Sequence, residues 1–217
     1  MKGDRIVVED YHRTAAARIV PSLVESIRQK PTRHVIAVAG ESGSGKSETA
    51  QALAEALRER GLQSVILGMD DYFVLPPRSN DARRRQDPHW LGPHVEVRLG
   101  ALDANLREAI SGKTMISKPM VDYDANIICE ETVTLEGIRV VIVEGTYTSL
   151  LKHVDTRIFI ERTRQDTLEH RRKRNRGNEA GDPFIEQVLA AEHMIIAGHR
   201  HLADFLIMKD YEVVAVE

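Results

Sequence analysis

One octapeptide constrains this chain more than any other part of it. Residues 40–47 read Gly-Glu-Ser-Gly-Ser-Gly-Lys-Ser and match the pattern G-x-x-x-x-G-K-[ST] in full. An apolar run of strand length, residues 35–39, precedes the octapeptide, and residues 46–60 have helical periodicity. Glycines let backbone N–H groups converge on an anion, and a helix N-terminus adds its positive dipole. A strand, a glycine-rich turn and a helix in this order therefore predict a phosphate-binding loop.

The predicted loop gives its side chains separate roles. Lys46 is expected to reach the β- and γ-phosphates of a nucleotide, and the Ser47 hydroxyl is expected to ligate Mg²⁺. An ordinary glycine-rich turn is the alternative, which the flanking strand and helix oppose. The other nucleotide-binding candidates are the rest of the loop and the residue after Ser47, namely Gly40, Glu41, Ser42, Gly43, Ser44, Gly45 and Glu48.

Two carboxylates follow predicted buried strands. Asp70 comes shortly after the strand expected at residues 64–68, and Glu144 ends an apolar run of valines and isoleucine. Asp70 is expected to face the loop and to accept the proton of a hydroxyl that attacks the γ-phosphate. Glu144 is expected near the Mg²⁺, with Gly145 permitting a close approach of backbone. Asp71 is expected either to help hold a metal or to shape its turn, and solvated turns at both strand ends are the alternatives.

A basic cluster lies further along the chain, at residues 171–177. Guanidinium groups stabilise the negative charge that spreads over a phosphoryl group in transfer. We therefore expect Arg171 and Arg174 to belong to a lid that closes over the nucleotide and excludes water. A solvated helix face is the alternative for any single arginine of the cluster.

Apolar strands alternate with helical segments along the chain, which predicts a parallel sheet covered on both faces. Residues 74–97, with four prolines, are expected to be irregular, and residues 114–136 a hairpin insertion. A helix is expected to begin at Asp182-Pro183, and a last core strand at residues 205–208, followed by a short tail strand. The expected organisation of the 217 residues is one domain: an N-terminal helix at about 9–29, a core at about 33–208, an acceptor-site insertion at about 74–136 and a lid at about 166–182.

Composition excludes several other classes of protein. Hydrophobic residues make up 42% of the chain, which is enough for an ordinary core and excludes wholesale disorder. The formal net charge of -3 gives no reason to expect nucleic acid or an anionic membrane as a partner. The single cysteine, Cys129, excludes an intrachain disulfide framework, and the charged start of the chain does not resemble a signal peptide. The expected location is the cytoplasm.

Taken in order, these features resemble the uridine kinase and phosphoribulokinase family, which also includes pantothenate kinase. The resemblance rests on the octapeptide, Asp70 with Tyr72-Phe73, Val-Glu-Gly at 143–145, the arginines after residues 166–168, and Ala-Asp-Phe-Leu-Ile at 203–207. It implies a P-loop NTPase-type α/β three-layer sandwich with a five-stranded parallel sheet, a helical lid and a small β insertion. It also implies ATP with Mg²⁺ as the phosphoryl donor, Asp70 as the catalytic aspartate, and Arg171 and Arg174 on the lid.

Two departures from the family pattern concern the acceptor. Uridine kinases usually have a Pro-x-Tyr-Asp segment followed by a histidine that contacts the base. Here residues 119–124 read Pro-Met-Val-Asp-Tyr-Asp, and residues 126–128 offer no histidine. The lid Arg-Asp pair of the family reads Arg174-Asn175 in this chain. By the family resemblance the acceptor is expected to be a nucleoside first, and the departures leave pantothenate-like acids, glycerate and phosphosugars as further candidates.

The predicted acceptor site lies beyond Asp70. Tyr123 could cover a base or sugar, and the triplet at residues 83–85 could bind an acidic group. Packed loop residues and a solvated basic triplet are the alternatives. The acceptor-binding candidates are Asp70, Tyr72, Arg83, His94 and Tyr123.

The leading prediction is an ATP-dependent kinase that phosphorylates a hydroxyl of a small metabolite. A nucleotide-hydrolysing switch or motor is a second hypothesis, although the chain has no Asn-Lys-x-Asp or Leu-Ser-Gly-Gly-Gln segment. A regulatory nucleotide-binding module is a third, although such a module needs no base at Asp70. The sequence leaves the oligomeric state open, and the N-terminal helix is expected to cover a sheet edge or to form a homo-oligomer contact.

Overall fold

A computed structural model describes residues 6–167 and 182–216 of the chain. Within these residues the central sheet has the strand order β2-β5-β1-β6-β7-β8. The first five strands of that order pair in parallel, and β8 pairs antiparallel with β7. The strand bounds are β1 His34–Gly40, β2 Ser64–Gly68, β5 Val140–Glu144, β6 Thr156–Ile160, β7 Phe205–Ile207 and β8 Val213–Ala215. The expected five-stranded parallel sheet and the short tail strand are both present.

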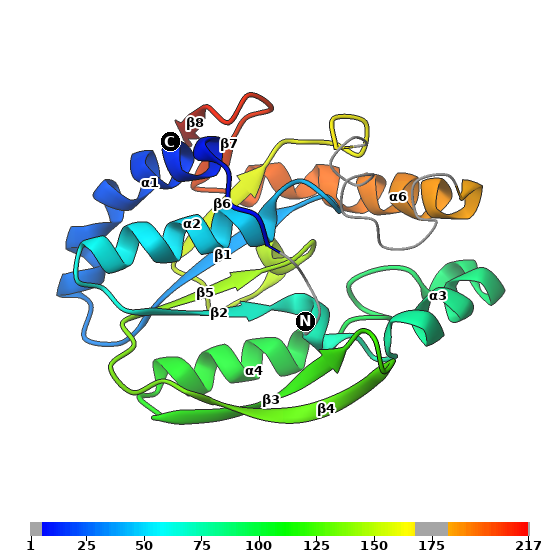
Figure 1. Ribbon diagram of the computed structural model, residues 1–217, viewed down its shortest axis with the longest axis horizontal. Coiled ribbons are helices and arrows are strands. Elements are labelled where there is room, and N and C mark those ends of the chain that lie inside the picture. Colours follow the sequence, from blue (N-terminus) through cyan, green and yellow to red (C-terminus); the bar gives the residue numbers. More distant parts are fainter. Residues whose placement is uncertain (1–5, 168–181, 217) are drawn as a thin grey trace.

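The sheet is covered on both faces, as its unbroken apolar strands predict. All seven residues of β1 are buried, and residues 35–38 alternate between two hydrophobic clusters. Ile36 and Val38 pack with helices α1 (Asp10–Gln29) and α2 (Lys46–Glu59), while Val35 and Ala37 pack with α4 (Leu99–Ile110). Figure 1 shows α1 and α2 above the sheet and α4 below it, which makes the three layers of an α/β sandwich.

Helix α6 (Pro183–Ile196) packs against strands β6 and β7. Its Ile196 joins Phe159 and Leu206 in a third, smaller apolar cluster. The helix begins as predicted, because the Asp182 side chain accepts a hydrogen bond of 2.9 Å from the Phe184 N–H and Pro183 occupies the first helical position. The lid predicted at about 166–182 lies largely outside the described residues, as do Arg171 and Arg174.

The predicted insertion has more helix than its sequence suggested. Strands β3 (Met115–Asp122) and β4 (Ile127–Thr134) form the expected antiparallel hairpin, which lies against α4 (Figure 1). Residues 74–97, however, are not irregular throughout, because α3 spans Pro77–Gln86. Its proline stands in the first turn, where a missing N–H costs nothing, so the prolines there start the helix rather than prevent it. Short 3-10 segments complete the described chain: η1 Met69–Tyr72, η2 Pro88–Trp90, η3 Thr148–Leu150 and η4 Ala197–Leu202.

None of the described helices combines the length and the apolar character that crossing a membrane requires.

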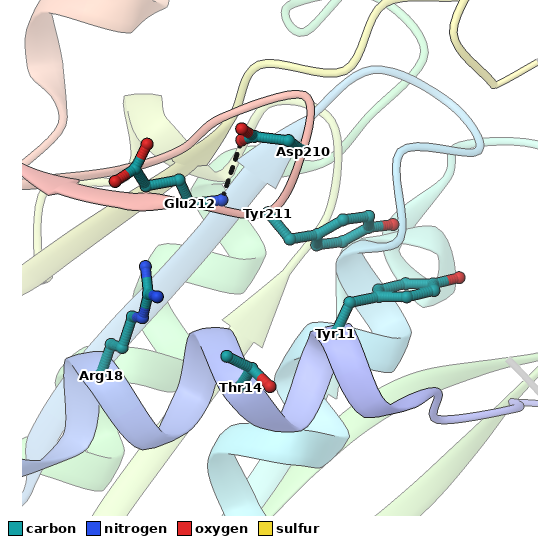
Figure 2. A pocket seen from close by; sticks show the side chains of 6 residues that line it. All are labelled: Tyr11, Thr14, Arg18, Asp210, Tyr211 and Glu212. Atoms are coloured by element: carbon teal, nitrogen blue, oxygen red, sulfur yellow. Dashed lines mark hydrogen bonds between the residues drawn. The ribbon is translucent and has the colours of Figure 1, made fainter.

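The two ends of the described chain meet at the back of the glycine-rich loop. Tyr11 and His12 come from α1, and Tyr211 comes from the turn between β7 and β8. The rings of Tyr11 and Tyr211 lie side by side with centroids 4.1 Å apart (Figure 2), and His12 meets the edge of Tyr211 at 5.2 Å. A methyl group on Gly45 would lie 3.0 Å from His12 Nε2 and 3.4 Å from the Tyr211 hydroxyl. Helix α1 therefore supports the loop as well as covering the sheet.

Gly45→Ala tests this support. Gly45 has φ of +96°, and a Cβ there would press on the His12 ring. We expect the variant to lose about 1–3 kcal/mol of unfolding free energy, the usual cost of a left-handed conformation in a non-glycine residue. Gly100→Ala is the matched control, because Gly100 lies in helix α4 with open space around it. It should be neutral or more stable by up to about 1 kcal/mol in urea denaturation. Equal stabilities of the two variants would contradict the role of Gly45.

Candidate functional site

The octapeptide forms the turn between β1 and α2. Gly40 ends β1, and Lys46 begins α2. The Lys46 ammonium lies across the turn and donates a hydrogen bond of 2.9 Å to the Glu41 carbonyl. Ser44 is fully buried, and its hydroxyl has no hydrogen-bond partner among the described residues. The predicted strand, loop and helix are thus present in the expected order, with the lysine folded over the loop.

The position of β5 in the sheet brings Glu144 beside the loop. In the parallel register, Glu144 pairs with Val38 of β1 on one side and with Gly68 of β2 on the other. The loop begins two residues after Val38, and Asp70 lies two residues after Gly68. Because parallel strands end at the same edge, both predicted carboxylates stand at the carboxyl edge of the sheet next to the loop.

Several neighbours shift the pKa of Glu144, some upward and some downward. Burial is the largest influence and, with the nearby Asp70 charge, raises the pKa of Glu144 to about 7, against the opposing effects of Lys46 and of a hydrogen bond with the Ser47 hydroxyl. Asp70, Lys46 and Ser47 are all half-buried, so the group remains open to a ligand. These four side chains are the ones that the sequence assigned to phosphate, metal and proton transfer, and the fold gathers them.

The donors fit Mg²⁺ in their chemistry. Mg²⁺ takes oxygen ligands and usually keeps several waters while one or two carboxylates and the substrate phosphates hold it. The Ser47 hydroxyl and the Glu144 carboxylate supply such oxygens beside the loop. No group of three or more His, Cys, Asp or Glu side chains suited to a metal occurs in residues 6–167 and 182–216, so an all-protein metal cage is not described there.

Asp70 is held in place by its neighbours in η1. Met69, Asp71 and Tyr72 are buried, whereas Asp70 is half-buried. A methyl group on Gly145 would lie only 2.3 Å from the Met69 Cβ, so this close approach needs glycine, as the sequence predicted. The backbone of Gly145 therefore packs directly against the side chain of Met69, the residue before Asp70.

Asp71 shapes the turn rather than the metal site. Its carboxylate accepts hydrogen bonds of 2.7 Å from the Lys118 ammonium and 3.0 Å from the Val121 N–H. Lys118 also pairs with Glu131 at 2.6 Å and is itself buried. These contacts attach η1 to the β3–β4 hairpin.

The predicted acceptor residues do not converge. Tyr72 is fully buried and donates a hydrogen bond of 2.8 Å to Asn105, so it has no surface to offer a ligand and does not enter the site. Arg83 is exposed on α3 and pairs with Asp87 at 3.3 Å. His94 is exposed in the turn before Val97, and Tyr123 is half-buried between β3 and β4.

The basic triplet binds carboxylates of the chain itself. Besides the Arg83 pair, Arg84 contacts Glu96 at 2.7 Å, and Arg85 contacts Asp81 at 3.0 Å and Asp182 at 2.6 Å. The Arg84 and Glu96 pair is the buried one, with Glu96 at 0% exposure. Each arginine of the triplet therefore has an acidic partner, and only Arg84 is held by a buried one.

Sequence reasoning missed a polar cluster in the wall of the insertion. The Glu96 carboxylate accepts hydrogen bonds from Asn80 at 3.0 Å and from the Gly92 N–H at 3.0 Å, in addition to Arg84. Tyr147 is buried nearby, and burial, followed by the Glu192 and Glu96 charges, raises the pKa of its hydroxyl. Within residues 6–167 and 182–216 this hydroxyl has no hydrogen-bond partner. The only sequence signal was that Tyr147 closely follows Glu144.

A pocket of about 310 Å³ lies where the chain ends meet, beside the loop. The Arg162 guanidinium stacks over the Tyr211 ring at 5.0 Å and donates a hydrogen bond to its hydroxyl. Figure 2 shows the two tyrosine rings of this pocket beside α1, with two acidic residues on the turn above it. Its lining residues are Tyr11, Thr14, Arg18, Asp210, Tyr211 and Glu212.

Several curated proteins are similar in sequence. The chain is 32% identical over 193 residues to the bifunctional alpha-galactosidase/sucrose kinase AgaSK of Mediterraneibacter gnavus, a match that covers 83% of this chain but 20% of that protein. The chain thus corresponds to about a fifth of that relative. It is 27% identical over 162 residues to a uridine kinase of Ureaplasma parvum, with 70% of this chain and 75% of that protein covered.

Solved structures share the fold. A possible uridine kinase from Bacillus stearothermophilus has a TM-score of 0.64 at 16% identity, covering 89% of this chain and 97% of that one. D-glycerate 3-kinase from Cryptococcus neoformans has a TM-score of 0.63 at 17% identity, covering 97% and 99%.

The sequence profile described as "Phosphoribulokinase / Uridine kinase family" matches residues 35–191, which include the loop, Asp70, Glu144 and most of α6. With a match over most of its length and the corresponding fold, the chain belongs to the phosphoribulokinase and uridine kinase family of P-loop kinases.

Proposed function

We propose that this protein transfers the γ-phosphoryl group of ATP to a hydroxyl of a small, uncharged, polyhydroxylated metabolite. The observation that carries the proposal is the meeting of Asp70 and Glu144 at one edge of the sheet, beside Lys46 and Ser47. A nucleotide-binding module needs the lysine and the hydroxyl. It does not need a second carboxylate that is fixed by three buried neighbours.

Each side chain has a part in the proposed reaction. The loop N–H groups and Lys46 hold the triphosphate, and Ser47 with Glu144 would hold Mg²⁺, which supplies charge neutralisation when bound. Asp70 accepts the proton of the acceptor hydroxyl as that oxygen bonds to phosphorus and the bond to the ADP oxygen breaks. Arg171 and Arg174 remain the predicted lid residues that stabilise the transferring group.

The paired basic triplet favours an uncharged acceptor. Carboxylates from the chain itself already bind Arg83, Arg84 and Arg85, so an acceptor phosphate or carboxylate would have to compete with them, most of all at the buried Arg84. Pantothenate-like acids, glycerate and phosphosugars are correspondingly less favoured. Nucleosides and free sugars remain, and the 32% identity to a bifunctional protein named for sucrose kinase activity supports an uncharged sugar as a candidate beside the nucleoside.

We propose further that the adenine ring binds in the pocket lined by Tyr11 and Tyr211, whose two rings already contact each other. The pocket lies beside the loop, two aromatic rings line it, and Asp210 could accept hydrogen bonds from an exocyclic amino group. A base stacked there would extend from phosphates held at the loop.

Asp70→Asn tests the proton acceptor. We expect turnover to fall by about 10²–10⁴-fold, because the amide cannot take the proton, while calorimetry finds ATP binding unchanged. Asp71→Asn is the matched control. It should lower the unfolding free energy by about 1–3 kcal/mol through the damaged Lys118 pair, with a much smaller effect on turnover. Near-normal turnover in Asp70→Asn would remove Asp70 from this role.

A panel of acceptors tests the substrate class. We expect MgATP-dependent ADP release with an uncharged sugar or a nucleoside, and none above background with pantothenate, glycerate or a phosphosugar. The same panel with Asp70→Asn serves as the blank for each acceptor. Strong release with a phosphosugar would contradict the argument from the paired triplet. Rapid release without any acceptor would favour a nucleotide-hydrolysing switch instead.

Tyr11→Ala tests the nucleobase pocket. Loss of a base-stacking ring should weaken ATP binding by roughly tenfold, whereas inorganic triphosphate, which has no base, should bind as it does to the wild type. Tyr11→Phe retains the ring and should bind ATP normally. If Tyr11→Ala weakened both ligands equally, the ring would be supporting the loop rather than contacting a base.

A further inference from the structure

Helix α6 contacts the glycine-rich loop through two adjacent residues. The Glu192 carboxylate accepts a hydrogen bond of 2.9 Å from the Ser42 N–H and one of 3.2 Å from the Ser42 hydroxyl. The next residue, His193, lies 2.5 Å from Glu41 through its Nδ1. Glu41 also accepts a hydrogen bond of 2.6 Å from the Arg164 N–H in the segment after β6. The first two side chains of the loop after Gly40 are thus both bound by distant parts of the chain.

The Glu192 carboxylate is an unexpected neighbour for an anion-binding loop. It is 5% exposed, and burial raises its pKa, with the nearby Lys46 charge and the Ser42 bonds opposing that effect. The Lys46 charge also lowers the pKa of Glu144, so the ammonium acts on both carboxylates. A buried negative charge at this place repels an incoming triphosphate, so its presence needs a structural reason. The hydrogen bonds of Glu192 to Ser42 supply that reason.

The Glu192 carboxylate acts on the loop through Ser42. A charge-assisted hydrogen bond to the Ser42 N–H directs it toward α6, and a second bond to the hydroxyl of the same residue fixes the rotation of Ser42. A loop that is already in one conformation loses less entropy when a ligand binds. The contact therefore acts on the shape of the loop, through Ser42, and not on the ligand directly.

We propose that Glu192 is a positioning residue that holds the phosphate loop in its nucleotide-binding conformation through its two bonds to Ser42. The inference rests on the proposed function, since it concerns ATP binding at that loop. It adds a residue from α6 that no loop pattern contains.

Two variants separate reach from charge. Glu192→Asp keeps the charge but withdraws the oxygens from Ser42 by one methylene, whereas Glu192→Gln keeps the reach and removes the charge. We expect Glu192→Asp to weaken MgATP binding by about tenfold in calorimetry, and Glu192→Gln to stay within about threefold of the wild type. In turnover assays Glu192→Asp should raise the KM for ATP without a comparable change in the KM for the acceptor. Met194→Ala, on the same helix at 77% exposure, is the matched control and should bind MgATP as the wild type does.

The opposite pattern would overturn the inference. If Glu192→Asp bound MgATP like the wild type while Glu192→Gln bound it more tightly, Glu192 would act only as a repelling charge. Equal affinities in all three proteins would overturn the inference alone. A wild-type protein that bound no MgATP would overturn the proposed function and this inference together.

Discussion

The candidate site depends on the pairing of β5 between β1 and β2. This order places Glu144 level with Val38 and Gly68, so the loop and Asp70 lie on its two sides. Parallel pairing sets the distance between them, because the backbones of neighbouring strands are held about 4.8 Å apart. No contact between the side chains is needed to bring the carboxylates together. The hydrophobic residues that pair and cover these strands therefore build the site indirectly.

A second set of contacts holds the 3-10 segment η1, which bears Asp70. Its neighbours in η1 are buried against Gly145, Lys118 and Asn105, which belong to three different parts of the chain. The insertion thus has a structural function beside its predicted place at the acceptor site: it holds the backbone that bears Asp70. The pairing of its arginines with internal carboxylates belongs to the same stabilising role.

Residues whose positions follow from strand ends could be predicted from the sequence. Lys46, Ser47, Asp70 and Glu144 each follow a buried strand or the loop, and a parallel sheet brings such positions to one edge. The burial of Tyr72, a predicted acceptor-binding residue, could not be foreseen. Its place two residues after Asp70 says nothing about which way a 3-10 turn directs each side chain. Glu192 lies 150 residues from Ser42, and no periodicity indicates such a contact. The Arg171 and Arg174 assignments lie outside the described residues.

The contact of both chain ends with Gly45 has a consequence for how this sequence can change over evolution. His12 and Tyr211 lie outside the segment that the family profile matches, yet they limit the space behind a glycine inside it. A larger side chain at either position would press on the loop, and a smaller one would leave a gap behind it. Substitutions at the two ends are therefore tied to each other and to the loop. Residues outside the family match therefore take part in the packing that shapes the glycine-rich loop.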